Sequence, residues 1–213
     1  MEIIDNKALL LTLRHPQRVT TVIPKSKELP NNKVLVKWGL DEAKVLRNLK
    51  IRGIPSPILG AYDWPGQYKP FDHQKDTSAF LTLNQRAFCF NEQGTGKTGS
   101  VIWAADYLLK QRRIKRVLVI CPLSIMDSAW RADLFKFAMH RSVDIAYGAK
   151  DKRRAIIKGN AEFIIINFDG VELVSDEIAN GGFDLIVVDE ANAYKNVQTK
   201  RWKMLNSLLK PDT

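Results

Sequence analysis

The segment Ala87-Phe-Cys-Phe-Asn-Glu-Gln-Gly-Thr-Gly-Lys-Thr98 decides the fold class, because it joins an apolar run to a glycine-rich turn and then to a helical pattern. The run Ala87–Asn91 has the length and apolar character of a buried strand, and a helix is expected over about residues 97–109. Gly94 and Gly96 let the backbone curl so that successive N–H groups point inward. The order of strand, turn and helix therefore predicts a phosphate-binding loop.

Two side chains of this loop have the chemistry that a nucleoside triphosphate and Mg²⁺ require. Lys97 is expected to reach the β- and γ-phosphates and the Thr98 hydroxyl to ligate Mg²⁺, while the backbone of Thr95 completes the cradle between the glycines. Asn91 stands where the strict G-x-x-x-x-G-K-[ST] pattern has its first glycine. Without its flanks, Gly-x-Gly-Lys-Thr is also compatible with an ordinary glycine turn. The strand and helix around it favour nucleotide binding.

Further along the chain, apolar runs alternate with helical patterns. The runs show no polar alternation, which is typical of strands buried on both faces of a parallel sheet. The alternation predicts a doubly wound α/β domain that binds its ligands at the carboxyl ends of the strands. Strands are expected at residues 117–121, 143–146, 163–167 and 184–189, and helices at about residues 72–83, 128–137, 151–158 and 170–177.

An acidic pair follows the last of these strands. The run Asp184-Leu-Ile-Val-Val-Asp189 delivers Asp189 and Glu190 at its carboxyl end. Asp189 is expected to bind the hydration shell of Mg²⁺, and Glu190 to polarise the water that attacks a phosphate. Alone, an Asp-Glu pair is more simply a solvated strand end. Combined with the phosphate loop, it predicts an ATP-hydrolysing site whose catalytic residues are Lys97, Asp189 and Glu190.

The first 65 residues have a different texture. Short extended pieces are expected at residues 9–13, 19–23 and 34–38, separated by prolines and by an Asn-Asn pair. A single helix follows, with Asp41 as its expected N-cap. We therefore predict two domains, a small α+β accessory module over residues 1–65 and an α/β nucleotide-binding lobe over residues 66–213.

Composition narrows the class of protein. The 213 residues are 45% hydrophobic and 26% charged, which is typical of a globular chain and argues against extensive disorder. No apolar run reaches the length of a bilayer span, no signal peptide is visible, and only two cysteines are present. We expect a cytoplasmic, non-secreted protein without membrane attachment. The three histidines and two cysteines lack the spacing of a zinc site.

Charge adds a candidate partner. The formal net charge is +10, and residues 1–70 carry 12 basic and 6 acidic side chains. A polyanion such as nucleic acid fits this excess, because neutralised phosphates release counterions. A solvated basic surface explains the same numbers, so charge alone leaves both interpretations open.

Several stretches, taken in order over about residues 68–205, resemble motifs of superfamily 2 helicases and translocases, in particular the Swi/Snf-type ATPases. Asn192 departs from the last position of the family's DEAH-like motif II. The Gln motif is resembled by Phe71-Asp-His-Gln74, and motif I by Asn91–Thr98. Motif Ia is resembled by Val119-Ile-Cys-Pro-Leu-Ser124 with Trp130, and motif Ib by Phe163-Ile-Ile-Ile-Asn-Phe-Asp169. Motif II is resembled by Asp189-Glu-Ala-Asn192, and the segment after it by Ala193-Tyr-Lys-Asn196 with Thr199-Lys-Arg-Trp202.

The resemblance implies the first RecA-like lobe of an ATP-driven motor that uses ATP and Mg²⁺ on double-stranded DNA. The chain is then expected to stop before motif III and to lack the second lobe, so that alone it binds nucleotide but hydrolyses it weakly. A monomer from a bacterium or a phage is expected. An RNA helicase, a restriction-type motor and a non-catalytic ATP-dependent nucleic-acid-binding module remain alternatives.

The resemblance also implies further binding residues. Gln74 would recognise adenine through its amide and Phe71 would pack on the base, although a helix-start polar residue and a core phenylalanine are the simpler interpretations. Ser124 would contact a nucleic-acid phosphate or else cap the next helix. Lys195, Lys200 and Arg201 would line the same track or else be solvated charges. Trp130 is expected to pack between helices, and residues 1–65 to recognise substrate or to brace the lobe.

Overall fold

The computed structural model describes residues 1–209. The chain divides into two compact units, Met1–Trp64 with Pro70–Ser100, and Pro65–Lys69 with the chain from Val101 onward. We describe each unit by itself. The expectation that the chain stops before motif III falls on residues 210–213, which lie outside the described residues.

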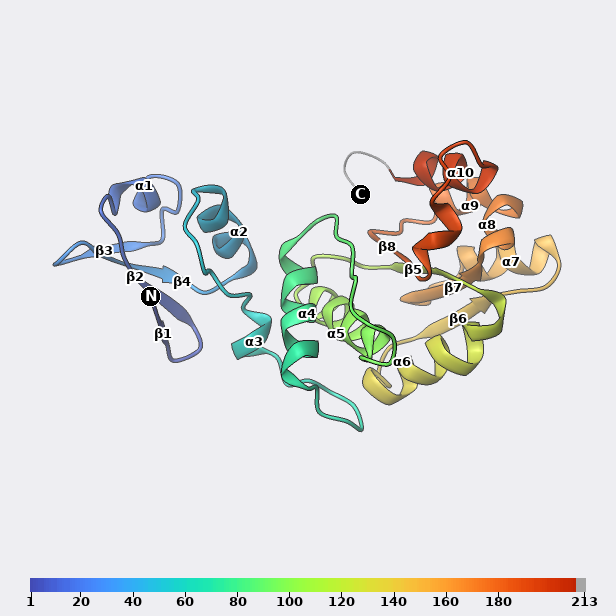
Figure 1. Ribbon diagram of the computed structural model, residues 1–213, viewed down its shortest axis with the longest axis horizontal. Helices are drawn as coiled ribbons and strands as arrows, with labels where there is room; N and C mark the ends of the chain where they lie inside the picture. The colour runs from blue at the N-terminus through green and yellow to red at the C-terminus, as the bar shows by residue number, and fades with distance from the viewer. Residues whose placement is uncertain (210–213) are drawn as a thin grey trace. The chain divides into compact units, whose positions relative to one another are not determined.

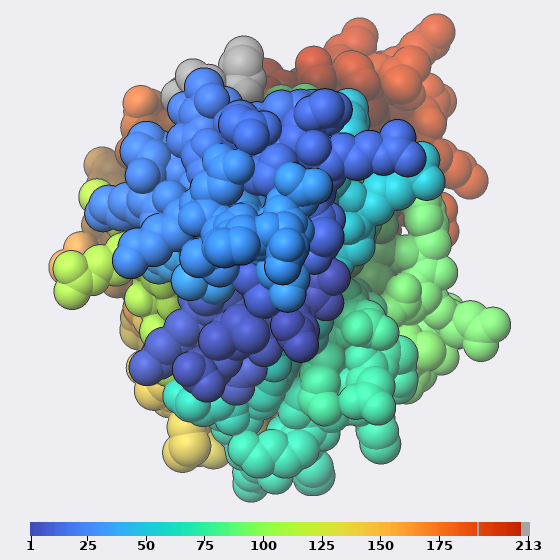
Figure 2. Space-filling view, turned by 90° about the vertical axis from the view of Figure 1, so that its left-hand side faces the viewer, coloured from blue at the N-terminus to red at the C-terminus, as the bar shows by residue number. Residues whose placement is uncertain are grey.

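The first unit begins with a four-stranded antiparallel sheet (Figure 1), and its N-terminal residues, coloured blue, face the viewer in Figure 2. Its strand order is β1-β2-β4-β3, and Leu9 of β2 pairs with Val36 of β4. Alternate residues of the two central strands, among them Leu11 and Val34, are buried and pack in one core cluster with residues of α2. The elements are β1 (Glu2–Ile4), β2 (Ala8–Thr12), α1 (Gln17–Thr20), β3 (Lys27–Leu29), β4 (Lys33–Lys37), α2 (Leu40–Asn48) and α3 (Ile58–Ala61).

Two expectations for this part were wrong. Residues 19–23 form a helical turn instead of an extended piece, because Val19 and Ile23 are both buried and the N–H of Ile23 donates to the carbonyl of Val19 at 2.8 Å. Asp41 does not cap α2, since the helix already begins at Leu40 after Gly39. At residues 19–23 the apolar spacing of one helical turn resembles that of a short strand.

The first unit continues with α4 (Asp72–Leu83) and the start of α5 (Lys97–Lys110). The two helices match the predicted ranges closely. The predicted strand at Ala87–Asn91 is absent, because residues 84–96 form neither helix nor strand. Phe88 and Phe90 are exposed and stack on each other with ring centroids 5.8 Å apart. An apolar run becomes a strand only where a neighbouring strand pairs with it, and among residues 1–209 none does.

The second unit contains a four-stranded parallel sheet in the order β6-β7-β5-β8. Val119 of β5 lies between Ile165 of β7 and Val187 of β8. Every residue of β5 and β7 is buried, as the continuous apolar runs predicted. The bounds are β5 (Val117–Cys121), β6 (Val143–Ala146), β7 (Phe163–Asn167) and β8 (Leu185–Val188), so the predicted α/β class is confirmed.

Helices cover both faces of this sheet. Val117, Val119 and Cys121 pack with α5 and the segment after β5, whereas Leu118 and Ile120 pack with the four later helices. The predicted helix at residues 128–137 is a π-helix followed by an α-helix, and the predicted helix at 170–177 is two short helices. The remaining elements are η1 (Leu123–Ile125), η2 (Met126–Arg131), α6 (Ala132–Phe137), α7 (Lys150–Lys158), α8 (Phe168–Leu173), α9 (Ser175–Ala179), η3 (Ala191–Tyr194) and α10 (Lys200–Leu208).

Candidate active site

The glycine-rich loop has the backbone conformation that its sequence requires. Gly94 and Gly96 have φ values of +78° and +72°, a region that residues with a Cβ rarely adopt. The helix α5 begins directly after them at Lys97. The unpaired N–H groups of its first turn and its positive dipole end therefore lie at the loop, as an anion site needs.

Hydrogen bonds hold the loop together from inside. The ammonium of Lys97 donates to the carbonyls of Asn91 at 2.9 Å and Glu92 at 2.8 Å, and the Thr95 hydroxyl donates to the same Glu92 carbonyl at 2.8 Å. The amide of Asn91 donates to the Thr77 hydroxyl of α4 at 2.9 Å. Asn91, which replaces the first glycine of the strict pattern, thus anchors the loop to a neighbouring helix.

The start of α4 contacts the loop through two side chains. The amide nitrogen of Gln74 donates to the Thr95 carbonyl at 3.1 Å, and the ring nitrogen Nε2 of His73 lies 3.1 Å from the same oxygen. The Gln74 amide oxygen accepts from the backbone N–H of Phe71 at 3.0 Å. Phe71 is 69% exposed and its ring stacks on His73. Gln74 is therefore fixed against the loop, with an aromatic ring accessible beside it.

In the second unit, the carboxylate of Asp189 is held at the end of β8 by two donors. The indole N–H of Trp130 donates to Oδ2 at 2.9 Å, and the backbone N–H of Glu190 donates to Oδ1 at 2.9 Å. The backbone N–H of Asp189 donates to the Ile120 carbonyl of β5. Each carboxylate oxygen keeps lone-pair capacity for a further donor such as a metal-bound water.

Glu190 lies where the backbone leaves the sheet. Its φ of 55° and ψ of 58° place it in the left-handed region, which costs a residue with a Cβ about 1 kcal/mol or more. The side chain is exposed. Strain of this kind at an exposed acid is typical of functional positions, where the chain turns sharply to present a side chain.

The buried thiol of Cys121 lies near this acidic end. Burial raises its pKa to about 12, and the negative charge of Asp189 adds to the rise. The thiol is therefore neutral, and Cys121 packs in the core as a small apolar side chain. Cys89, in contrast, is only half-buried.

The residues predicted to contact nucleic acid are exposed, but some have carboxylate partners. Lys200 lies 3.8 Å from Glu172, and Arg201 pairs with Asp169 and lies over the ring of Phe168. Ser124 and Lys195 are exposed. The structure thus leaves the cations accessible, with two of them oriented by α8.

Three contacts at these sites have no signal in the sequence. The contact of His73 with the Thr95 carbonyl and the bond from Asn91 to Thr77 join residues that lie 22 and 14 positions apart. Trp130 is 2% exposed, so it packs as expected, yet its N–H also reaches Asp189. Packing and hydrogen bonding by one buried tryptophan are compatible, because a buried indole N–H needs an acceptor.

Among residues 1–209, no three His, Cys, Asp or Glu side chains lie together as a metal-binding cluster. None of the helices in that range combines the length and apolar character that crossing a membrane requires.

Comparison with known proteins identifies the family of this chain. Residues 73–212 match the model of the SNF2-related domain. The chain is 30% identical over 115 residues to the ISWI chromatin-remodeling complex ATPase ISW2 of Saccharomyces cerevisiae. The matched region covers 51% of this chain and 10% of that protein. It is 22% identical over 184 residues to an uncharacterized ATP-dependent helicase, YqhH, of Bacillus subtilis, with coverage of 83% and 30%.

A solved structure agrees with these matches. The SWI2/SNF2 ATPase core of Sulfolobus solfataricus in complex with double-stranded DNA has a TM-score of 0.60 and 26% identity, over 69% of this chain and 31% of that one. The chain thus spans about a third or less of the length of these relatives. The resemblance to Swi/Snf-type ATPases that the motifs predicted is confirmed.

Proposed function

Because the chain belongs to the SNF2-related family, we propose that it is the ATP-binding lobe of an ATP-dependent translocase or helicase acting on double-stranded DNA. The observation that carries the proposal is the glycine loop at the start of α5, with Lys97 inside it and Gln74 fixed against it. We propose residues 66–213 as the motor lobe and residues 1–65 as an accessory module. A second RecA-like lobe completes the motor.

In this proposal residues 70–100, the part of the first unit that belongs to the motor lobe, bind the nucleotide. The N–H groups of Gly94, Thr95 and Gly96 and the first turn of α5 bind the phosphates. The Lys97 ammonium, now bound to two loop carbonyls, exchanges these acceptors for phosphate oxygens, which carry full negative charge and bind an ammonium more strongly. Gln74 and the exposed ring of Phe71 then select adenine.

The oxygen donors of Thr98 and Asp189 fit Mg²⁺, which prefers hard oxygen ligands and retains several waters. Among residues 1–209 the Thr98 hydroxyl has no side-chain or backbone partner, and each Asp189 oxygen has one donor and room for a second. When bound, Mg²⁺ would neutralise charge that develops on the phosphates. Glu190 would accept a hydrogen bond from the attacking water and orient it.

Duplex DNA as the partner is supported by charge and by a relative. The net charge is +10, and the matched ATPase core of Sulfolobus solfataricus was solved in complex with double-stranded DNA. We propose that Ser124, Lys195, Lys200 and Arg201 contact the phosphate backbone. The carboxylates beside Lys200 and Arg201 would orient these cations and weaken each contact in part.

The test is ATP hydrolysis by the protein that carries both lobes, measured with duplex DNA, single-stranded DNA and RNA at two salt concentrations. We expect the strongest stimulation from duplex DNA and a loss of stimulation at high salt, because phosphate contacts weaken as salt rises. Stimulation by RNA alone would indicate an RNA helicase instead of a DNA translocase. Nucleotide and DNA binding without turnover would indicate a non-catalytic binding module.

A further inference from the structure

A basic groove lies between the C-terminal end of α2 and the end of α4, within the first unit. Its volume is about 610 Å³. Arg47, Lys50 and Arg52 contribute three cations to its lining, Phe80 contributes an aromatic ring, and no carboxylate lines it. We call it the α2–α4 groove. The phosphate loop and the Asp189 carboxylate are not part of it.

The cations of the α2–α4 groove are positioned and accessible. The guanidinium of Arg47 donates to the Leu83 carbonyl and to the Asn84 side chain, both at 3.3 Å, so α4 holds it at the groove. Lys50 and Arg52 are exposed, and within residues 1–209 neither side chain has an ion-pair or hydrogen-bond partner. Three cations without a carboxylate in one groove repel one another unless an anion joins them.

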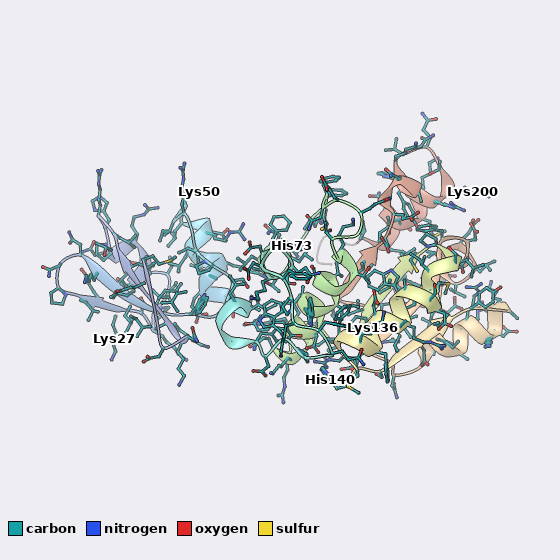
Figure 3. The ribbon with its side chains drawn as sticks, turned by 60° about the horizontal axis from the view of Figure 1, so that its bottom comes forward. Lys27, Lys50, His73, Lys136, His140 and Lys200 are labelled. Carbon is teal, nitrogen blue, oxygen red and sulfur yellow. The ribbon has the colours of Figure 1, made fainter. Side chains whose placement is uncertain are left out.

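Lys50 occupies a backbone position that favours glycine. After α2 its φ is +64°, its N–H donates to the Arg47 carbonyl at 2.9 Å, and the N–H of Ile51 donates to the Leu46 carbonyl at 3.1 Å. This pattern is a Schellman motif, whose left-handed residue is usually glycine or asparagine. A lysine there strains the backbone, and it is a cation of the groove. Figure 3 shows its side chain extending away from the body of the unit.

Phe80 adds a recognition element that a phosphate site alone does not need. Its side chain is on α4, lines the groove and is 48% exposed. A row of cations beside an exposed aromatic ring is the combination with which proteins hold single strands, because cations bind the backbone and any base can stack on the ring. A duplex offers no such face, since its bases are already stacked on each other.

We propose that the α2–α4 groove binds a segment of single-stranded nucleic acid, with phosphates at Arg47, Lys50 and Arg52 and a base stacked on Phe80. The groove has the volume of sites that take up a single small ligand, roughly 300–1,000 Å³, which is room for a nucleotide or two of one strand. A motor on duplex DNA would use such a site to hold a strand that is displaced or unpaired.

The experiment measures binding of a fluorescent oligothymidine of about 12 nucleotides by the full 213-residue chain. Lys50→Gly removes the cation and relieves the positive φ, so binding weakens about three- to tenfold and the salt slope falls by about 0.7, while the melting temperature stays equal or rises. Phe80→Leu keeps an apolar side chain but removes the stacking face, and binding weakens roughly 5- to 150-fold.

The matched control is Lys27→Gln on β3, an exposed cation that lies apart from Lys50 in Figure 3 and does not line the groove. It removes the same charge and leaves binding within about twofold. Equal losses in Lys27→Gln and Lys50→Gly would overturn the proposal, because charge alone would then explain them. Wild-type affinity in both groove variants, or no binding by the wild-type chain, would overturn it as well.

The result is separable from the proposed motor function. ATP binding and duplex-stimulated hydrolysis depend on the phosphate loop and on Asp189, and the groove variants leave ATP binding unchanged. If duplex DNA fails to stimulate hydrolysis while oligothymidine binding depends on Lys50 and Phe80, the translocase proposal is wrong and the groove proposal stands. If duplex DNA stimulates hydrolysis but both groove variants bind oligothymidine like the wild type, only the groove proposal is wrong.

Discussion

The indole N–H of Trp130 donates to Oδ2 of Asp189 at 2.9 Å, and this bond joins the helical segment after β5 to the carboxyl end of β8. Trp130 is 2% exposed, so the bond is shielded from water. Since the other carboxylate oxygen accepts from the Glu190 N–H, two donors fix the orientation of the carboxylate. In the proposed motor this makes Trp130 a positioning residue for the metal-binding acid.

Trp130→Phe should raise the Mg²⁺ concentration needed for half-maximal ATP hydrolysis by about tenfold or more, because outer hydrogen bonds to metal-binding residues have effects of that size. The change keeps an aromatic ring in the core and removes only the N–H donor. The measurement is a Mg²⁺ titration of turnover at saturating ATP in the protein with both lobes.

Trp103→Phe is the matched control for this change. Trp103 is 1% exposed and its N–H donates to the Pro65 carbonyl at 3.0 Å, away from the acidic pair. It should lose stability but keep the Mg²⁺ dependence of the wild type. An equal shift of the Mg²⁺ titration in both variants would show that Trp130 acts only through packing.

Lys97→Ala should weaken ATP binding by about 10- to 100-fold, the range expected when a hydrogen bond to a charged group is lost. The measurement is binding of a fluorescent ATP analogue to the full chain. Lys115→Ala removes an exposed lysine that precedes β5 and should bind ATP like the wild type. Equal affinity in the two variants would contradict the phosphate role of Lys97.

Glu190→Gln should retain ATP binding and lose turnover in the protein with both lobes, because the amide cannot accept a proton or polarise water as a carboxylate does. The left-handed backbone at this position is kept, since the two side chains have the same shape. Turnover by rapid quench, with ATP affinity measured in parallel, checks the prediction. Normal turnover would remove Glu190 from the mechanism.

Gly96→Ala and Gly94→Ala separate backbone strain from the contact with Gln74. Both have positive φ, so both substitutions should destabilise the fold by ~1–2 kcal/mol. A Cβ on Gly96 would lie 2.2 Å from the Gln74 amide nitrogen, whereas a Cβ on Gly94 meets nothing within 4 Å. Only Gly96→Ala should therefore displace Gln74 and reduce the preference for ATP over GTP, measured by competition binding. Equal loss of preference would exclude Gln74 as its source.

The two cysteines should react differently with iodoacetamide at pH 8. Cys121 is buried and its pKa is raised to about 12, so it stays a protected thiol, while the half-buried Cys89 is alkylated. Peptide mass spectrometry of the folded chain measures both. The ordinary pKa of the thiol is 9.0, so Cys121 ionises at a lower pH in the unfolded chain than in the folded chain. The stability that the neutral Cys121 contributes to the fold is therefore lost as pH rises from 9 towards 12. Rapid labelling of Cys121 would contradict its burial.

The sequence by itself determined the elements whose signal is local or repeats along the chain. The bounds of α4 and of three parallel strands followed from apolar spacing and flanking turns, and Gly94 and Gly96 marked positions of positive φ. The pairs Lys97–Thr98 and Asp189–Glu190 were found because strand ends and helix starts have recognisable sequence signals. Each of these predictions rests on residues that lie within about ten positions of one another in the sequence.

Only the tertiary structure decided what depends on distant partners. Ala87–Asn91 is apolar enough for a strand, but no pairing strand is present within residues 1–209. The bond from Trp130 to Asp189, the contact of His73 with the loop and the α2–α4 groove each join segments that are well separated in sequence. Hydrogen bonds and grooves form between surfaces that folding brings together, and a linear pattern contains no record of which surfaces those are.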